Sequence, residues 1–301
     1  MLYQLSYSRL RRVNPPGYDY ITGYGIIELM PIQEKCRILD HQKVGPRFYK
    51  LTLLSKYIAT HAEPGQFVEV RCAAGYEPLL RRPLSFHKIN PQHETFELFY
   101  EVIGKGTELL TKQTVGSELD VLGPLGSGFK IDPAKKVHIL IGGGMGVAPL
   151  RALAEAIKGP GAGVQGPEKK TVYSLIGAKT KEYVQCESEI KTAADQVVVS
   201  TDDGSYGEKG LVSDLLLELF ANSLPPTNYS LTTIYACGPK AMLKAVAEIA
   251  WQKQIDCQLS MEERMACGIG ACKGCAVMTR SGYKMACKDG PVFAAAEVVW
   301  S

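Results

Sequence analysis

Four cysteines lie within 21 residues near the end of this 301-residue chain and are candidates for binding a metal. Cys267, Cys272 and Cys275 follow the spacing C-x4-C-x2-C, and Cys287 comes after eleven intervening residues. Thiolates bind iron and zinc well, and this spacing is typical of loops that hold a [2Fe–2S] cluster. Structural zinc sites more often use two C-x2-C pairs. The spacing therefore predicts a [2Fe–2S] cluster, with structural zinc and metal-free thiols as alternatives.

Three glycines lie between Cys267 and Cys275, and a bound cluster would explain them. Three ligands on one short loop force the backbone to curl, so that its amide groups can point at the sulfur atoms. Gly268, Gly270 and Gly274 are expected to supply the backbone angles that this curl requires.

The rest of the composition excludes several classes of protein. Nine cysteines are an odd number, whereas disulfide frameworks are usually even and belong to small secreted chains. The N-terminus shows no apolar run followed by a cleavage site, so we expect a reducing, cytoplasmic setting. No apolar run approaches the ~18 residues of a membrane span. The net charge of +3 is too weak to predict binding to nucleic acid.

A second candidate site is a glycine turn at the end of a predicted strand. The apolar run Val137–Ile141 is followed by Gly142-Gly-Gly-Met-Gly146 and by a predicted helix over about 147–158. Such a turn lets the backbone approach a pyrophosphate, whose charge suits a helix N-terminus. The match to G-x-G-x-x-G is imperfect, and the acidic residue expected ~20 positions later is not evident. A dinucleotide site is the functional interpretation, and a purely structural turn is the alternative.

The two candidate sites together require a third group. A nicotinamide exchanges a hydride, which carries two electrons, whereas a [2Fe–2S] cluster exchanges one electron at a time. A flavin can connect the two, so the pairing predicts a flavin site. The candidate is Arg82-Pro-Leu-Ser85, whose arginine and serine suit phosphate or the flavin ring. A second glycine turn, Gly104-Lys-Gly-Thr107, adds a hydroxyl, although each motif alone also fits a structural role.

The elements that would position these groups change type near Pro133. Residues 34–130 contain short runs rich in β-forming residues, separated by turn residues, which indicates an all-β barrel or sandwich. Strands then alternate with helices, which favours a parallel sheet with helices on both faces. The tail from Cys257 onward is expected to consist of loops.

The predicted fold class is α+β multidomain. An antiparallel β-barrel FAD domain would cover 34–132, an α/β parallel-sheet nucleotide-binding domain 133–256, and a small C-terminal [2Fe–2S] loop domain 257–301. Residues 1–33 would form an extension, either loosely attached or acting as a strap on a partner.

The order of these motifs resembles that of the ferredoxin–NADP reductase superfamily. Cys237-Gly-Pro239 follows the motifs above in the same order. Thr201-Asp-Asp-Gly-Ser-Tyr-Gly207, Met261-Glu-Glu-Arg-Met-Ala-Cys267 and Cys287-Lys-Asp-Gly-Pro-Val-Phe293 narrow the resemblance. Over about 34–293 the chain is similar to the electron-transfer subunits of two-subunit, NAD-dependent dihydroorotate dehydrogenases. The longer extension and the pair Lys273-Gly274 depart from that pattern.

The resemblance implies a role for each motif residue. The residues implied to hold the flavin and its phosphates are Arg82, Pro83, Leu84 and Ser85. Those implied to line the isoalloxazine and ribityl region are Tyr100, Glu101 and Val102, with Gly106 and Thr107 at the pyrophosphate. Those implied to meet the nicotinamide cofactor are Gly143, Gly144 and Gly146, with Asp202 near its far end and Cys237 beside the nicotinamide as a catalytic residue. Those implied to ligate the cluster are Cys267, Cys272, Cys275 and Cys287.

The resemblance also implies a partner. A separate FMN-containing catalytic subunit would oxidise dihydroorotate, and electrons would pass through the [2Fe–2S] cluster and FAD to NAD⁺. The cysteine loop would lie at the interface of a hetero-oligomer, such as a heterotetramer. No arginine cluster for a 2′-phosphate is obvious, which favours NAD over NADP. The alternatives are a reductase subunit of a hydrogenase, a sulfite reductase or a ferredoxin-coupled transhydrogenase, and, in another class, a zinc-stabilised scaffold or sensor.

Overall fold

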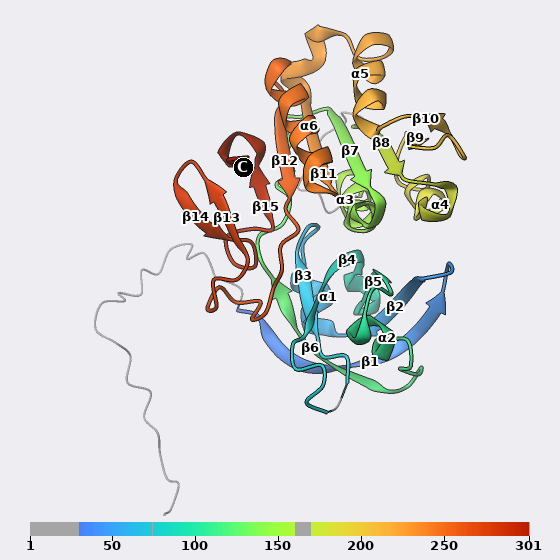
Figure 1. Cartoon of the computed structure of the whole chain (residues 1–301), viewed down its shortest axis with the longest axis vertical. Coiled ribbons are helices and arrows are strands. Elements are labelled where there is room, and N and C mark those ends of the chain that lie inside the picture. Colours follow the sequence, from blue (N-terminus) through green and yellow to red (C-terminus); the bar gives the residue numbers. More distant parts are fainter. Residues whose placement is uncertain (1–29, 74, 160–169, 301) are drawn as a thin grey trace, which may run out of the picture. The chain divides into compact units, whose positions relative to one another are not determined.

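Within the residues that the structure describes, six antiparallel strands close into a barrel (Figure 1). The computed structural model describes residues 30–73, 75–159 and 170–300, so residues 1–29 of the predicted extension lie outside the described residues, whereas its residues 32 and 33 belong to the first barrel strand. The strands follow the order β1-β2-β5-β4-β3-β6. Their bounds are β1 (Ile32–Lys43), β2 (Phe48–Leu54), β3 (Phe67–Val70), β4 (Arg82–Asn90), β5 (Thr95–Glu101) and β6 (Glu118–Leu125). The short helices between them are α1 (Lys56–His61), η1 (Pro91–His93) and α2 (Lys105–Leu110).

Alternation along the strands fills the barrel with apolar side chains. Leu51 and Leu53 of β2 pack with Phe96 and Leu98 of β5 in one buried cluster. Successive side chains on a strand point to opposite faces, so the intervening residues face outward. Closure of the sheet leaves no unpaired edge strand. The side chains of β3 and β4 that point away from the barrel core can therefore contact other parts of the chain.

The second half of the described chain forms a sheet of seven strands in the order β10-β9-β8-β7-β11-β12-β15. The strands are β7 (Val137–Gly143), β8 (Thr171–Ala178), β9 (Gln196–Thr201), β10 (Glu208–Lys209), β11 (Thr232–Cys237), β12 (Asp256–Ser260) and β15 (Val292–Ala294). The helical segments are η2 (Gly144–Val147), α3 (Ala148–Lys158), η3 (Lys181–Tyr183), α4 (Glu187–Ile190), α5 (Val212–Asn222), η4 (Pro226–Leu231), α6 (Lys240–Gln252) and η5 (Ala295–Glu297). All neighbouring strands pair in parallel except β12 and β15.

Helices cover both faces of this sheet, as predicted (Figure 1). Ile139 of β7 packs with α5 and α6, whereas its neighbour Leu140 packs with α3 on the other face. The strand order reverses at β7, because the chain runs outward through β8 on one side and through β11 on the other. Ligands of open α/β sheets bind at such a switch point, beyond the carboxyl ends of the strands. The barrel and parallel-sheet fold class is thus confirmed.

The prediction that the tail from Cys257 consists of loops is wrong. Cys257 lies in β12, so the boundary predicted between 256 and 257 falls inside a strand of the large sheet. The tail also contains a hairpin of β13 (Ala276–Thr279) and β14 (Gly282–Met285), together with β15. Strands of three to five residues are too short to show a hydrophobic period among so many glycines and cysteines.

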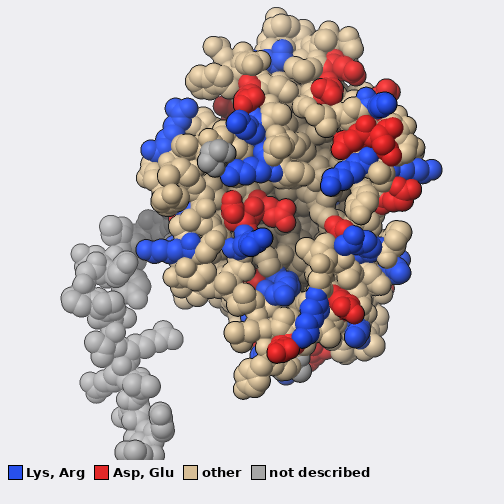
Figure 2. All heavy atoms as spheres, in the orientation of Figure 1, with Lys and Arg blue, Asp and Glu red and all other residues tan. Residues whose placement is uncertain are grey.

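The face in Figure 2 carries basic and acidic side chains that are interspersed, in keeping with a net charge of +3. None of the described helices is both long and apolar enough to span a membrane.

Candidate functional site

The cysteine loop directs backbone amides at all four of its sulfur atoms. Gly270 N donates to Cys287 Sγ at 3.0 Å, and Cys272 N donates to Cys267 Sγ at 3.4 Å. Cys287 N donates to Cys275 Sγ at 3.4 Å, and Gly274 N donates to Cys272 Sγ at 3.5 Å. Such amides stabilise negative charge on sulfur. The loop therefore fits an anionic metal–thiolate group, as the spacing predicted.

The glycine prediction for this loop is correct at two positions and wrong at the third. Gly268 and Gly270 have positive φ values of 70° and 81°, which side chains other than glycine rarely adopt. Gly274 has no such value, and the left-handed residue is its neighbour Lys273, at 56°. Gly274 contributes its amide rather than its conformational freedom.

The strongest interactions among the four thiols join Cys267 with Cys272 and Cys287 with Cys275, and a weaker one joins Cys287 with Cys267. Among the described residues, the three metal-ligand atoms that lie within 4.8 Å of one another belong to His87, Cys186 and Glu189. The four loop sulfurs do not form such a set. One tetrahedral zinc with Zn–S bonds of ≈ 2.3 Å would hold all four sulfurs within about 4 Å of one another. Two pairs suit a binuclear cluster better, because each metal takes two thiolates.

Cys267 and Cys287 differ in how readily they ionise. Burial disfavours the Cys267 thiolate, but the amides of Cys272, Ile269 and Ala271 outweigh it and lower the pKa of Cys267 to about 6. Burial, reinforced by the Cys275 thiol, raises the pKa of Cys287 to about 12. Cys272 is exposed. The sulfur of Cys267 is therefore ready to bind a cation at neutral pH.

A buried carboxyl group, which sequence reasoning missed, lies beside this loop. Glu69 of β3 is 1 % exposed, and neither carboxyl oxygen has a hydrogen-bond partner among the described residues. Burial raises its pKa to about 7, against the opposing charge of Arg81. On its strand Glu69 pairs with Pro83 of the predicted flavin motif. An unsatisfied buried carboxyl is costly, so its place between the motif and the cysteine loop indicates room for a further group.

The predicted flavin motif and the second glycine turn lie together. Arg82–Ser85 begins β4, where Leu84 pairs with Val68 and Ser85 with Phe67 of β3. A Cβ atom at Gly106 would lie 2.6 Å from Arg82 Nε, so the missing side chain makes room for the guanidinium. The guanidinium bonds to the Leu80 carbonyl at 2.7 Å. A guanidinium held beside a glycine turn in this way fits a bound phosphate.

Two predicted flavin residues already have partners for their hydroxyl groups. Thr107 Oγ1 donates to the Gly104 carbonyl at 3.1 Å and accepts from Ile103 N. Tyr100 is 1 % exposed in the barrel core, and its hydroxyl bonds to His41 Nε2 at 2.8 Å. Both hydroxyl groups stabilise local structure.

The other two predicted flavin residues share one arginine. Glu101 forms an ion pair with Arg47 at 3.5 Å, and the carbonyl of Val102 accepts from Arg47 Nη2 at 3.0 Å. Arg47 thereby fixes the end of β5 beside the second glycine turn.

The nucleotide turn and Cys237 meet at the switch point of the sheet. Cα positions pair Cys237 with Gly142, and a Cβ atom at Gly146 would collide with the Cys237 carbonyl. A Cβ atom at Gly143 would meet Met242 of α6. Gly144 has a φ of 54° and nothing within 4 Å, so it alone of the three glycines predicted to meet the cofactor faces open space.

The sulfur of Cys237 is a neutral thiol. Burial is the main reason that its pKa is raised to about 12. It can pack against a flat ring but is not a nucleophile at neutral pH. Asp202 is exposed just after β9, where its amide donates to the Ala178 carbonyl at 3.0 Å. β9 and β7 are separated by β8, so Asp202 shares the carboxyl edge of the sheet without adjoining the glycine turn.

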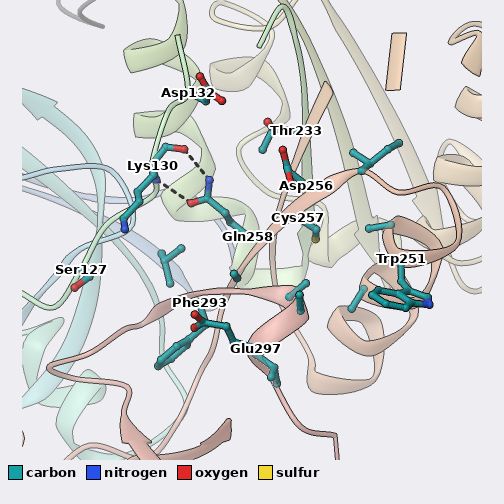
Figure 3. Close-up of a pocket in the computed structure, with 18 of the residues that line it drawn as sticks. Ser127, Lys130, Asp132, Thr233, Trp251, Asp256, Cys257, Gln258, Phe293 and Glu297 are labelled. Atoms are coloured by element: carbon teal, nitrogen blue, oxygen red, sulfur yellow. Dashed lines mark hydrogen bonds between the residues drawn. The ribbon is translucent and has the colours of Figure 1, made fainter. Parts of the chain in front are cut away.

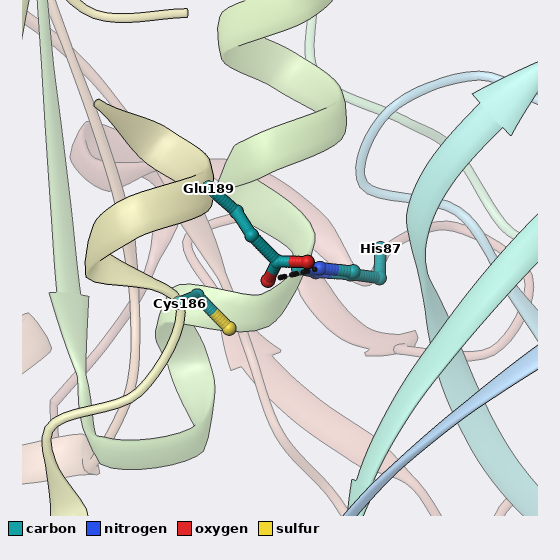
Figure 4. A group of neighbouring side chains, drawn as sticks. All are labelled: His87, Cys186 and Glu189. Atoms are coloured by element: carbon teal, nitrogen blue, oxygen red, sulfur yellow. Dashed lines mark hydrogen bonds and ion pairs between the residues drawn. The ribbon is translucent and has the colours of Figure 1, made fainter. Parts of the chain in front are cut away.

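A polar cluster between the barrel and the sheet also escaped sequence reasoning. His87, Cys186 and Glu189 place their ligand atoms within 4.8 Å of one another (Figure 4). Arg151 Nη1 lies 3.0 Å from Glu189 Oε1, and Lys50 Nζ lies 2.9 Å from the same oxygen. Two cations therefore already neutralise this carboxylate, and a metal ion beside them would be repelled. The cluster is an ion-pair network.

A cavity of ≈ 900 Å³ lies elsewhere, between α6, β12 and the C-terminal segment (Figure 3). Trp251 lines it, and Gln258 forms two hydrogen bonds with the backbone of Lys130, at 2.7 and 2.8 Å. None of the predicted cofactor residues lines this cavity. It is therefore separate from the candidate site.

Comparison with known proteins agrees with this geometry. Residues 262–299 match the family model of the iron–sulfur cluster binding domain of dihydroorotate dehydrogenase B, and residues 140–248 match that of the oxidoreductase NAD-binding domain. The chain is 40% identical over 272 residues to a dihydroorotate dehydrogenase B (NAD⁺) electron transfer subunit from Geobacillus thermodenitrificans, covering 89% of this chain and 98% of that protein. It is 36% identical to the same subunit from Caldanaerobacter subterraneus, covering 88% and 98%.

Solved structures support the same conclusion. An NADH-dependent reduced ferredoxin–NADP oxidoreductase aligns with a TM-score of 0.74 at 29% identity, over 88% of this chain and 90% of that one. A ferredoxin–NADP⁺ reductase from Neisseria gonorrhoeae with bound FAD and NADP aligns with a TM-score of 0.59 at 18% identity, over 73% and 91%, which shows the fold alone. The sequence resemblance is thus confirmed: the chain belongs to the family of electron transfer subunits of dihydroorotate dehydrogenase B (NAD⁺).

Proposed function

We propose that this chain passes electrons from a dihydroorotate-oxidising partner subunit to NAD⁺ through a [2Fe–2S] cluster and FAD. When bound, these groups exchange single electrons at the cluster and a hydride between flavin and nicotinamide. The observation that carries the proposal is the cysteine loop, whose four sulfurs each accept a backbone amide. Its contact with the barrel at Glu69 brings the loop next to the predicted flavin motif.

The chain's own residues would bind and orient the three groups. Cys267 and Cys272 would hold one iron, and Cys275 and Cys287 the other. Arg82, with Gly106 leaving space for it, would bind flavin phosphate, while Ser85 would meet the ring. The sets proposed to complete these sites are Pro83, Leu84, Tyr100, Glu101, Val102 and Thr107 for the flavin, and Gly143, Gly144, Gly146, Asp202 and Cys237 for NAD. The domains proposed with these sites are 32–132 for the flavin, 133–260 for NAD and 261–301 for the cluster, because β1 begins at Ile32 and β12 ends at Ser260.

The partner would carry FMN and would dock on the cysteine loop within a hetero-oligomer, such as a heterotetramer. Cys272 and the nearby Ile269 are both exposed, so the loop offers a partner an accessible sulfur atom and an apolar side chain. We place the assembly in the cytoplasm, where a low-pKa thiol such as Cys267 stays reduced before cluster insertion.

An anaerobic absorbance spectrum of the purified chain tests the proposal. Flavin bands and a broad iron–sulfur shoulder, both of which bleach on addition of NADH, are expected. Cys272→Ala should keep FAD and its reduction by NADH but lose electron transfer from the partner. A colourless protein that contains zinc, or full coupled activity in Cys272→Ala, would overturn the proposal.

A second candidate function rests on the TM-score of 0.74 to the ferredoxin–NADP oxidoreductase. In that case the chain would serve as the reductase subunit of a ferredoxin-linked complex. The two candidates differ in the electron donor. Reduction of the chain's flavin by partner subunit plus dihydroorotate supports the first, and reduction by ferredoxin alone supports the second.

A further inference from the structure

Arg151 is a buried arginine that joins the sheet to the barrel. It lies on α3, immediately after the nucleotide turn, and is 8 % exposed. Its guanidinium contacts Glu97 of barrel strand β5 at 3.1 Å, Glu189 of α4 at 3.0 Å and Glu155 of its own helix at 3.1 Å. One of the three partners therefore belongs to the barrel and two belong to the sheet's own helices.

His87 makes a second link beside the first. It lies on β4, two residues after Ser85, and is fully buried. Its Nδ1 contacts the carbonyl of Ala148 at 2.8 Å, and since a carbonyl only accepts, Nδ1 carries a proton. Ala148 is the first residue of α3, directly after the turn Gly144–Val147. The other ring nitrogen lies 3.1 Å from Glu189.

These contacts join the two elements that the proposed reaction must align. One is the strand that begins with the flavin motif, and the other is the helix that begins at the nucleotide turn. Apolar surfaces can slide over one another, whereas buried ion pairs and hydrogen bonds are satisfied in one arrangement only. Hydride transfer needs reacting atoms ≈ 3–3.5 Å apart, and a displacement of about 1 Å can cost about 100-fold in rate.

We propose that His87 and Arg151 are positioning residues, which hold the nucleotide turn against the flavin strand in the arrangement that permits hydride transfer. Neither residue is assigned contact with a cofactor. The inference rests on the proposed function, because it presumes that NADH and flavin react at this boundary.

Two of the glutamates that form ion pairs with Arg151 provide a matched pair of variants. Glu97→Gln removes the ion pair to the barrel, and Glu155→Gln removes an ion pair of equal length within α3. Both substitutions preserve shape. In stopped-flow mixing of the FAD-loaded chain with saturating NADH, Glu97→Gln should slow flavin reduction by about tenfold or more, with Kd for NADH changed less than about threefold. Glu155→Gln should behave as wild type.

His87 allows a rescue experiment. His87→Ala should slow flavin reduction at saturating NADH. His87→Asn, whose amide can still donate to the Ala148 carbonyl, should recover most of the rate, and His87→Gln should recover less. Hydrogen exchange gives a reading that needs no turnover. The amides of residues 146–148, 150 and 151 should lose protection in Glu97→Gln but keep it in Glu155→Gln.

The outcomes separate this inference from the function beneath it. If NADH does not reduce the wild-type flavin, the proposed function fails. If wild type is reduced and both Glu97→Gln and His87→Ala match its rate, only the positioning role fails. Equal slowing by Glu97→Gln and Glu155→Gln would also overturn the positioning role, because the effect would then come from Arg151's charge balance and not from the link to the barrel.

Discussion

Glu69 and Gly268 pack against each other across the boundary between the barrel and the cysteine loop. A Cβ atom at Gly268 would lie 2.7 Å from Cγ of Glu69, and the φ of Gly268 is 70°. This one contact places the proposed cluster beside the proposed flavin site. The close approach and the left-handed backbone both require glycine.

Gly268→Ala should therefore disturb the cysteine loop. The left-handed backbone and the steric overlap together cost about 1–3 kcal/mol, and the overlap pushes the loop away from Glu69. Iron and sulfide content per chain should fall. Gly282→Ala is the control, because Gly282 also has a positive φ of 100° but meets nothing within 4 Å. Equal iron content in the two variants would contradict the prediction.

Gly106→Ala should weaken FAD binding. The added Cβ would overlap Arg82 Nε and force the guanidinium out of its place on α2. Loss of a charge-assisted phosphate contact costs about 1.5–3 kcal/mol, which corresponds to a rise in Kd of roughly tenfold or more. Titration of apo-protein with FAD, followed by flavin fluorescence, measures this. Gly104→Ala, where nothing lies within 4 Å, should bind FAD as wild type does.

Acid should weaken the junction between barrel and sheet. The hydrogen bond from His87, supported by Lys50 and Arg151, lowers the pKa of Glu189 to about 2. A carboxyl whose pKa is lower in the folded state contributes stability above its unfolded pKa of about 4.3, and that stability is lost as the pH falls towards 2. The free energy of unfolding, measured with urea between pH 5 and 3, should fall more steeply in wild type than in Glu189→Gln. Parallel curves would rule out this role for Glu189.

Alkylation of the protein without its cluster should separate the cysteines by pKa. Cys267, with a pKa of about 6, is largely thiolate at pH 7, whereas Cys237, with a pKa of about 12, is protonated. Brief treatment with iodoacetamide and peptide mass spectrometry should find Cys267 modified and Cys237 intact. Insertion of the cluster should then protect Cys267. Preferential labelling of Cys237 would show that its thiol is not held as the structure indicates.

The local chemistry of this chain could be predicted from its sequence. Cysteine spacing, the glycines at 268 and 270, and the order of the motifs are properties of contiguous residues, so they could be read without a fold. The change from short β runs to alternating strands and helices likewise predicted a barrel followed by a parallel sheet. The same reasoning failed in the tail. The three-residue strand β15 forms there because it pairs with β12, a neighbour that the local sequence does not reveal.

How the sites lie relative to one another follows from the packing of the folded chain. In the sequence Glu69 is an ordinary strand residue. The structure shows that Gly268, 199 positions away, packs against it. The motif predicts Gly143 and Gly146 as cofactor contacts, but only the structure shows that their missing side chains also make room for Met242 and for the Cys237 carbonyl. Arg151 and His87 belong to none of the motifs. Contacts between residues far apart in the chain depend on the packing of whole domains, and no local pattern of residues encodes them.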